Sequence, residues 1–244
     1  MKMFKKTLIG AALAAGVALS AQASMINVGG VVWDPDSVFD FKGTSATTVQ
    51  NINPLTGELS GYGTVTVLNN TFQSAFCPGC ELTFNFSGYF PVIGGAIPSG
   101  GTAISYVGGL YNIYVDNTPE TNGGTTMTAA NTADGALWAQ LVGHANNLGI
   151  TLTGLDFFPT ALLGNGSLDV IGGLAAGNLD TNTKTGGSDL LFSASFTDFP
   201  DGTPLHATGV STFNGNSIPE PASLALVGLG LIGAGALRRR KAAK

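Results

Sequence analysis

Charged side chains are scarce in this chain of 244 residues, at 10% of the composition, where about a quarter is usual. The shortage is greatest for cations in residues 24–216, where Lys42 and Lys184 stand against fourteen carboxylates. This central segment therefore has a net charge of about −12. A surface of that sign repels phosphate backbones, which excludes nucleic-acid binding. It favours solubility and cationic partners such as divalent metal ions.

Short catalytic motifs are also missing. The sequence contains no G-x-S-x-G, no H-E-x-x-H and no P-loop. Its two histidines, His144 and His206, stand alone, and we expect them to be half-buried packing residues. Paired carboxylates could serve a glycosidase, but nothing places Glu58, Glu81 or Glu120 in a pocket. The favoured interpretation is a protein that is not an enzyme and has no organic cofactor.

Cysteine occurs only twice, at Cys77 and Cys80, with Pro78 and Gly79 between them. A C-x-x-C pair can be a redox dithiol, but that chemistry requires the first thiol at a helix N-terminus. Here Cys80 runs directly into an alternating, strand-like pattern. In an oxidising compartment the two cysteines most simply form a disulfide that closes a Pro-Gly turn. A metal site would need two further soft ligands.

Period-two alternation is abundant, and it is typical of half-buried antiparallel strands. In residues 81–87, Leu82, Phe84 and Phe86 share one face. Glycine, proline and asparagine separate about ten such segments, for example at Gly164-Asn165-Gly166. The pattern predicts one all-β domain over residues 24–216, an antiparallel β-sandwich or jelly roll. The predicted strands cover residues 28–33, 38–42, 64–67, 81–87, 103–107, 111–115, 150–156, 167–171, 192–196 and 206–213.

One packed α-helix is expected at about residues 132–147. Leu137 and Leu141 lie four residues apart there, as on one face of a helix. Gly135 and Gly143 each cost about 1 kcal/mol of helix stability against alanine. We therefore expect this helix to depend on packing against the sandwich.

Three carboxylates, Asp34, Asp36 and Asp40, lie close together in the loop that follows Trp33. Clustered oxygen ligands suit Ca²⁺, although the spacing does not match an EF-hand loop. Two interpretations stay open, a Ca²⁺ site and ordinary solvated turn carboxylates.

The N-terminus has the features of a secretory signal: basic residues, a short apolar run and an A-x-A cleavage site. Cleavage is predicted before Ser24, with export through the Sec translocase. Residues 1–23, the signal peptide, are therefore left out of the fold. The features are Lys2, Lys5 and Lys6, the run 8–19, and Ala21 and Ala23.

Three blocks follow the predicted domain, in residues 217–244. Pro219, Glu220 and Pro221 should be extended, because proline fixes φ and removes a backbone donor. Residues 222–237 carry no charge, and as a membrane helix they would span about 24 Å of a hydrocarbon core of about 30 Å. A basic cluster then keeps the end of the chain on the cytoplasmic side. This cluster consists of Arg238, Arg239, Arg240 and Lys241.

This order of blocks, behind a signal peptide, resembles the PEP-CTERM sorting domain carried by exosortase substrates of Gram-negative bacteria. The resemblance implies retention in the inner membrane with the domain in the periplasm, recognition of Pro219-Glu220-Pro221, removal of the tail, and release to the surface or matrix. An ordinary tail anchor is the alternative, and it would not require Pro-Glu-Pro.

The resulting hypothesis is a non-enzymatic cell-surface or extracellular protein associated with exopolysaccharide in a biofilm or floc. One alternative is a carbohydrate-binding module, with or without Ca²⁺, that stacks sugars on Trp33 or on exposed tyrosines. A secreted hydrolase is the second alternative.

Overall fold

The computed structural model describes residues 25–93, 102–120 and 127–218. Strands dominate these ranges, and none of the helices in them is long and apolar enough to cross a membrane. The strands are β1 (Ile26–Val28), β2 (Val31–Trp33), β3 (Phe41–Ile52), β4 (Leu59–Thr64), β5 (Val67–Leu68), β6 (Thr71–Phe72), β7 (Glu81–Pro91), β8 (Thr102–Asp116), β9 (Ala136–Gly143), β10 (Leu152–Asp156), β11 (Leu162–Gly172), β12 (Leu190–Asp198) and β13 (His206–Gly215). The helical turns are α2 (Gln73–Phe76), α3 (Ala176–Leu179) and a 3₁₀ turn (Thr185–Gly187).

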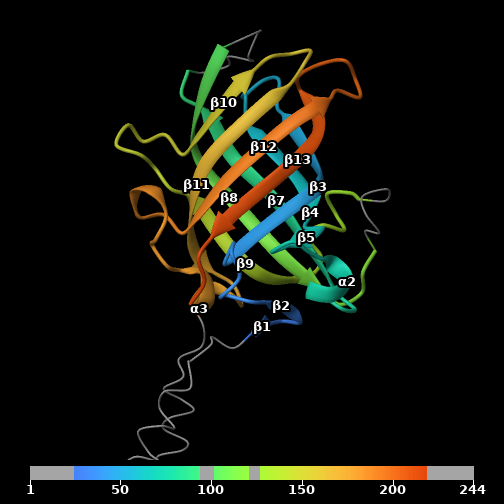
Figure 1. Ribbon diagram of the computed structural model, residues 1–244. Helices are drawn as coiled ribbons and strands as arrows, with labels where there is room; N and C mark the ends of the chain where they lie inside the picture. The colour runs from blue at the N-terminus through green and yellow to red at the C-terminus, as the bar shows by residue number, and fades with distance from the viewer. Residues whose placement is uncertain (1–24, 94–101, 121–126, 219–244) are drawn as a thin grey trace, which may run out of the picture.

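The strands from β3 to β13 form one antiparallel sheet that closes on itself. The closing pair is β3 with β13, which run side by side from Asn51 opposite His206 to Phe41 opposite Gly215. β9 and β10 occupy a single position, because both lie between β8 and β11, one after the other. The result is an eight-stranded barrel with strands oblique to its axis (Figure 1), as closure of a sheet requires.

The all-β antiparallel prediction is confirmed, but the sandwich or jelly roll is wrong. A β-sandwich and a closed barrel show the same alternation of apolar and polar residues, so the sequence pattern does not distinguish them. Two long strands and the β3–β13 pairing make this sheet a barrel. β8 joins the predicted strands 103–107 and 111–115 into one element, and β3 extends well beyond the predicted strand at residues 38–42.

The predicted helix at residues 132–147 is also wrong, because its centre is the strand β9. Leu137 and Leu141 are four residues apart, a spacing that fits a helix face but also one face of a strand through Ala139. β8 pairs with β9 along most of β9, so hydrogen bonding to a neighbouring strand makes this segment a strand and not a helix. The two short α-helical turns, α2 and α3, lie elsewhere.

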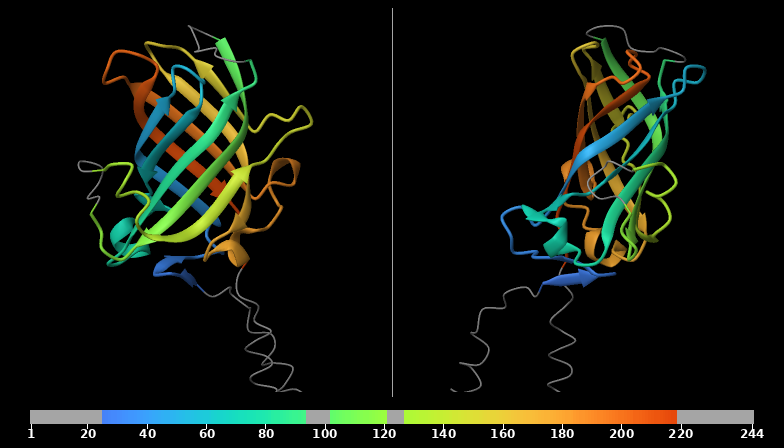
Figure 2. Two further views of the ribbon diagram at one scale, coloured as in Figure 1. Left: turned by 180° about the vertical axis from the view of Figure 1, so that it is seen from behind. Right: turned by 90° about the vertical axis from the view of Figure 1, so that its right-hand side faces the viewer.

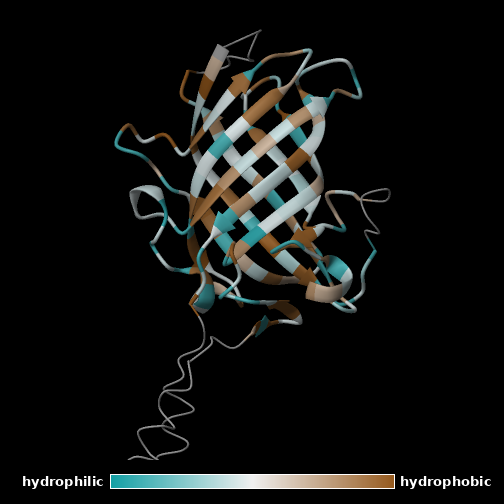
Figure 3. Ribbon diagram, viewed as in Figure 1, coloured by the Kyte–Doolittle hydropathy of each residue, from teal (hydrophilic) through white to brown (hydrophobic). Residues whose placement is uncertain are grey.

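Aromatic side chains fill the interior of the barrel. Hydrophobic and hydrophilic residues alternate along the strands (Figure 3), and the inward set divides into two groups of rings. One group packs near the end formed by β1 and β2 and consists of Trp33, Phe41, Trp138 and Phe213. The other packs towards the opposite end and consists of Phe84, Phe86, Tyr89, Tyr111 and Phe192.

A β1–β2 hairpin lies across one end of the barrel, which we call the base (Figures 1 and 2). The sequence suggested one strand over 28–33, but Gly29 and Gly30 have φ of 63° and 94° and make a turn. Positive φ at both central residues is the geometry that two-residue hairpins prefer. The hairpin buries Trp33, and its Val28 carbonyl accepts a 2.9 Å hydrogen bond from Trp138 Nε1.

Trp138→Ala should lower the free energy of unfolding by about 3–5 kcal/mol, because the ring is fully buried. The change also leaves the Val28 carbonyl without its indole donor. Urea unfolding of the purified protein measures this loss. Leu148→Ala is the control, since Leu148 is 81% exposed and should change stability by about 0.5 kcal/mol or less. A loss below about 1 kcal/mol for Trp138→Ala would contradict the description of the base.

Candidate functional site

The residues predicted to direct export and sorting lie outside the described part of the chain. They are Ala21, Ala23 and Ser24 at the signal cleavage site, Pro219, Glu220 and Pro221, and the basic residues Arg238, Arg239, Arg240 and Lys241, together with the predicted membrane helix. The structure does describe Ser217 and Ile218, the two residues that immediately precede Pro219. Their contacts place the start of the sorting segment on the barrel.

Ser217 is fastened to the base of the barrel by its backbone and its side chain. Its N–H donates to Asp40 Oδ1 at 3.0 Å, and its hydroxyl donates to the same oxygen. The same hydroxyl accepts a 3.1 Å hydrogen bond from Trp33 Nε1. Ser217 thus joins the N-terminal hairpin, the turn before β3 and the end of β13.

Ile218 continues this attachment onto α3. Its N–H donates to the Asn178 carbonyl at 2.7 Å, and its own carbonyl accepts from Asn178 Nδ2 at 2.9 Å. We call the set Trp33, Asp40, Asn178, Ser217 and Ile218 the exit latch. Because of the exit latch, the chain is held on the barrel up to the residue before Pro219.

The predicted Ca²⁺ ligands do not form a common site. Asp34 Oδ1 accepts the N–H of Asp36 at 2.9 Å within their turn, whereas Asp40 serves the exit latch. Within residues 25–93, 102–120 and 127–218, no group of three or more His, Cys, Asp or Glu could hold a metal ion. The geometry therefore favours the turn interpretation for Asp34 and Asp36, and it gives Asp40 a role that the sequence did not suggest.

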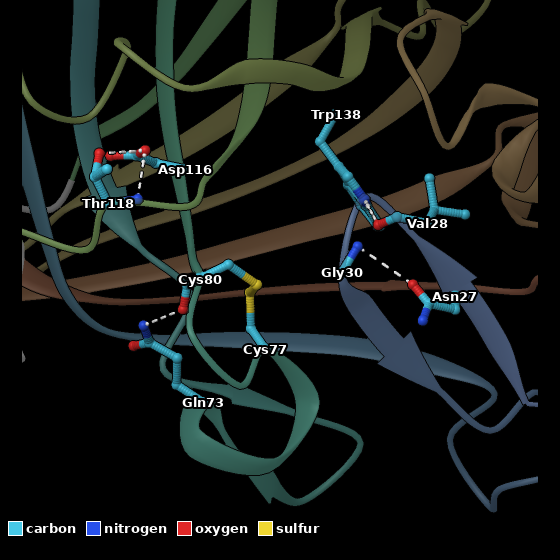
Figure 4. Close-up of a disulfide and its surroundings, with 9 residues drawn as sticks. All are labelled: Asn27, Val28, Gly30, Gln73, Cys77, Cys80, Asp116, Thr118 and Trp138. Carbon is cyan, nitrogen blue, oxygen red and sulfur yellow. Dashed lines mark hydrogen bonds between the residues drawn. A yellow bond between two sulfur atoms is a disulfide. The ribbon is translucent and has the colours of Figure 1, made fainter.

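Cys77 and Cys80 are joined by a disulfide between α2 and β7. Figure 4 shows this disulfide next to the β1–β2 hairpin, with Gln73 Nε2 donating to the Cys80 carbonyl at 3.0 Å. A Cβ placed on Gly30 would lie 3.5 Å from the Cys80 sulfur, so the disulfide packs against the hairpin turn. Both cysteines are buried. The disulfide therefore supports the base of the barrel.

His144 lies just after β9 and pairs with Asp169 of β11. Its Nδ1 is 2.8 Å from the carboxylate, and the two side chains are 23% and 34% exposed. No hydroxyl or thiol of the described residues is hydrogen-bonded to this imidazole. His144 and Asp169 therefore form a pair that joins two strands, and the described residues add no nucleophile to it. His206 is partly buried at the start of β13.

Most of the aromatic residues suggested as sugar platforms are buried, whereas Tyr62 and Tyr114 stay partly exposed. Trp33 is 2% exposed and packs against Phe41 and Trp138. The five tyrosines are either buried or partly buried; they are Tyr62, Tyr89, Tyr106, Tyr111 and Tyr114. Stacking of a sugar on Trp33 is therefore wrong, because its indole closes the base of the barrel.

Residues 217–241 match the family model of the PEP-CTERM protein-sorting motif. The match confirms the resemblance seen in the sequence and indicates an exosortase-targeted surface protein. It begins at Ser217 of the exit latch and covers about a tenth of the chain. No curated protein and no solved structure matches this chain.

Ser217→Ala should lower the free energy of unfolding by about 1–2 kcal/mol, because Trp33 Nε1 loses its acceptor and Asp40 loses one donor. Faster amide hydrogen exchange is expected at Ile218, whose N–H is bound by Asn178. Ser217→Thr keeps the hydroxyl and is the matched control. Equal exchange at Ile218 in both variants would mean that the hydroxyl does not hold the end of the chain.

Proposed function

We propose that this protein is an exosortase substrate whose barrel is delivered to the surface or polysaccharide matrix of a Gram-negative bacterium and acts there as a non-enzymatic structural component. The observation that carries the proposal is the exit latch. The sorting motif starts at Ser217, and this residue is hydrogen-bonded to both Trp33 and Asp40 at the base of a closed barrel.

The exit latch gives the barrel an orientation before processing. The tail that follows Ile218 enters the inner membrane, and the basic cluster Arg238–Lys241 stays on the cytoplasmic side. Since Ser217 and Ile218 are bound to the base, the base faces the membrane from the periplasm. The opposite end of the barrel faces away. Exosortase then acts close to the base, on a segment whose start is fixed in place.

Removal of both ends leaves every strand of the barrel in place. The last strand, β13, ends at Gly215, and the first, β1, begins at Ile26. Cleavage before Ser24 and cleavage after Ile218 therefore leave the sheet pairings unchanged. The released domain has two cations against fourteen carboxylates, so it is not attracted to anionic lipid surfaces. This charge supports release rather than continued membrane attachment.

A structural role is supported by what the candidate binding residues do in the fold. Trp33, suggested for sugar stacking, and Asp40, suggested for Ca²⁺, both hold Ser217. The partners of this proposal are the Sec translocase and exosortase during export, and the polysaccharide matrix afterwards.

Mass spectrometry of the protein from culture medium and from membranes tests the proposal in a Gram-negative host that encodes an exosortase. We expect a released species that begins at Ser24 and lacks Arg238–Lys241. Replacing Pro219, Glu220 and Pro221 together by alanine should keep the protein in the membrane fraction with its tail, because the processing enzyme no longer recognises it.

Pro54→Ala is the matched control, since Pro54 is an exposed proline in the turn between β3 and β4. This variant should be released like the wild type. Release of a chain that still carries Arg238–Lys241 would contradict the proposal. Membrane attachment of the wild type, with the Arg238–Lys241 tail retained in both fractions, would instead indicate an ordinary tail anchor.

A further inference from the structure

A cavity of about 40 Å³ lies inside the half of the barrel that is remote from the base. A buried water needs about 10–15 Å³, so the cavity has room for a molecule of a few non-hydrogen atoms. Its wall is mainly apolar and aromatic, with Phe86, Tyr89, Tyr106, Phe192 and Phe196 among the lining residues. The interior of an eight-stranded barrel is either filled by side chains or holds one small ligand.

The cavity exists because three neighbouring positions on the inner wall have almost no side chain. Gly164 of β11 lies opposite Gly154 of β10 on one side and opposite Ala194 of β12 on the other. It shares the inward face with the buried Leu162 and Leu168. A Cβ added to Gly164 would meet no atom within 4 Å. The sequence suggested a turn here, but the residue lies within a strand and leaves space in the barrel.

Two polar atoms on residues that line the cavity have no partner. Asp156 is 1% exposed; its Oδ1 accepts the Phe158 N–H at 2.6 Å, whereas its Oδ2 has no hydrogen bond. Tyr111 is 2% exposed, and its hydroxyl also has none. A buried polar atom without a partner costs free energy. These atoms are where a ligand would gain most by offering a hydrogen-bond donor.

The lining contains one charged side chain, Asp156. Burial and the charge of Asp156 raise the pKa of Tyr106 to about 12, so this phenol stays neutral at physiological pH. The aromatic faces around the cavity favour cations, as the carboxylate does. A ligand with a carboxylate of its own would be repelled.

We propose that this cavity is a binding site for a small apolar molecule with one terminal hydrogen-bond donor, above all an amine, and that Asp156 receives this donor. The apolar part occupies the space beside Gly164 and Gly154. An ammonium group gains a charge-assisted hydrogen bond to Asp156, which is about twice as strong as a neutral one. The site is independent of the exit latch and of the sorting proposal.

Three probes of the same length test the site on the purified full chain: butylamine, butan-1-ol and butyrate. Binding is measured at pH 7 by saturation-transfer NMR titration, which detects weak ligands. We expect butylamine to bind saturably and butan-1-ol to bind with an affinity at least about tenfold lower. Butyrate should not bind. Binding of butyrate as tight as that of butylamine, or no saturable binding of any probe, overturns the proposal.

Two variants locate the binding. Gly164→Val fills the cavity and should abolish binding of both butylamine and butan-1-ol. Asn165→Val, on the outward face of the same strand, is the matched control and should bind like the wild type. Circular dichroism checks that both are folded. Unchanged binding by a folded Gly164→Val would place the probes elsewhere and overturn the proposal.

Asp156→Asn tests the role of the carboxylate. It should remove most of the preference for butylamine over butan-1-ol while butan-1-ol still binds. A preference that stays tenfold or more in the folded variant would show that Asp156 does not receive the donor. If this variant does not fold, the comparison of butylamine with butyrate on the wild type decides the same point.

Discussion

The pairing of β3 with β13 is the interaction on which the rest of this structure depends. It joins the first long strand to the last one, so the sheet has an inside, and neither strand is left as an exposed edge. Part of this seam is polar and buried: the Thr48 hydroxyl lies 2.8 Å from the Ser211 hydroxyl and donates to Ser45 at 3.1 Å. The seam also brings Asp40, just before β3, next to Ser217, just after β13. The exit latch is therefore a direct result of closing the barrel.

The sequence predicted the local properties of the strands better than their arrangement. Leu82, Phe84 and Phe86 were placed on one face, and all three are buried in the core. Whether such strands build a sandwich or a barrel depends on pairing between residues more than 150 positions apart. The alternation within one strand does not predict which distant strand it pairs with. The spacing of Leu137 and Leu141 fits both a helix and a strand, so only pairing with the neighbouring strands β8 and β11 could decide.

The candidate sites also differ in how far the sequence predicts them, depending on whether they require tertiary structure. The sorting segment could be predicted because its three blocks are continuous in sequence and require no tertiary structure. Asp34, Asp36 and Asp40 are also close in sequence, but their carboxylates have different partners. Asp34 accepts the N–H of Asp36 within the turn, whereas Asp40 accepts the N–H of Ser217. The cavity could not be predicted, because it results from the register that aligns Gly154, Gly164 and Ala194 across three strands.

The two ends of the barrel are separated by its aromatic filling. Trp33, Phe41 and Trp138 pack together at the base with ring centroids 5.5–6.0 Å apart, and Phe213 stacks on Phe41 beside them. These rings lie between the proposed ligand site and Ser217, and no residue of the exit latch lines the cavity, so a ligand there would not contact the exit latch directly. Coupling between two sites requires that a ligand distinguish two states of the protein. Because the exit latch and the cavity share no residue, we expect removal of the tail to leave the affinity of the cavity unchanged. The exit latch at the base and the cavity at the other end are therefore two separate features of one barrel, and each proposal can be tested without the other.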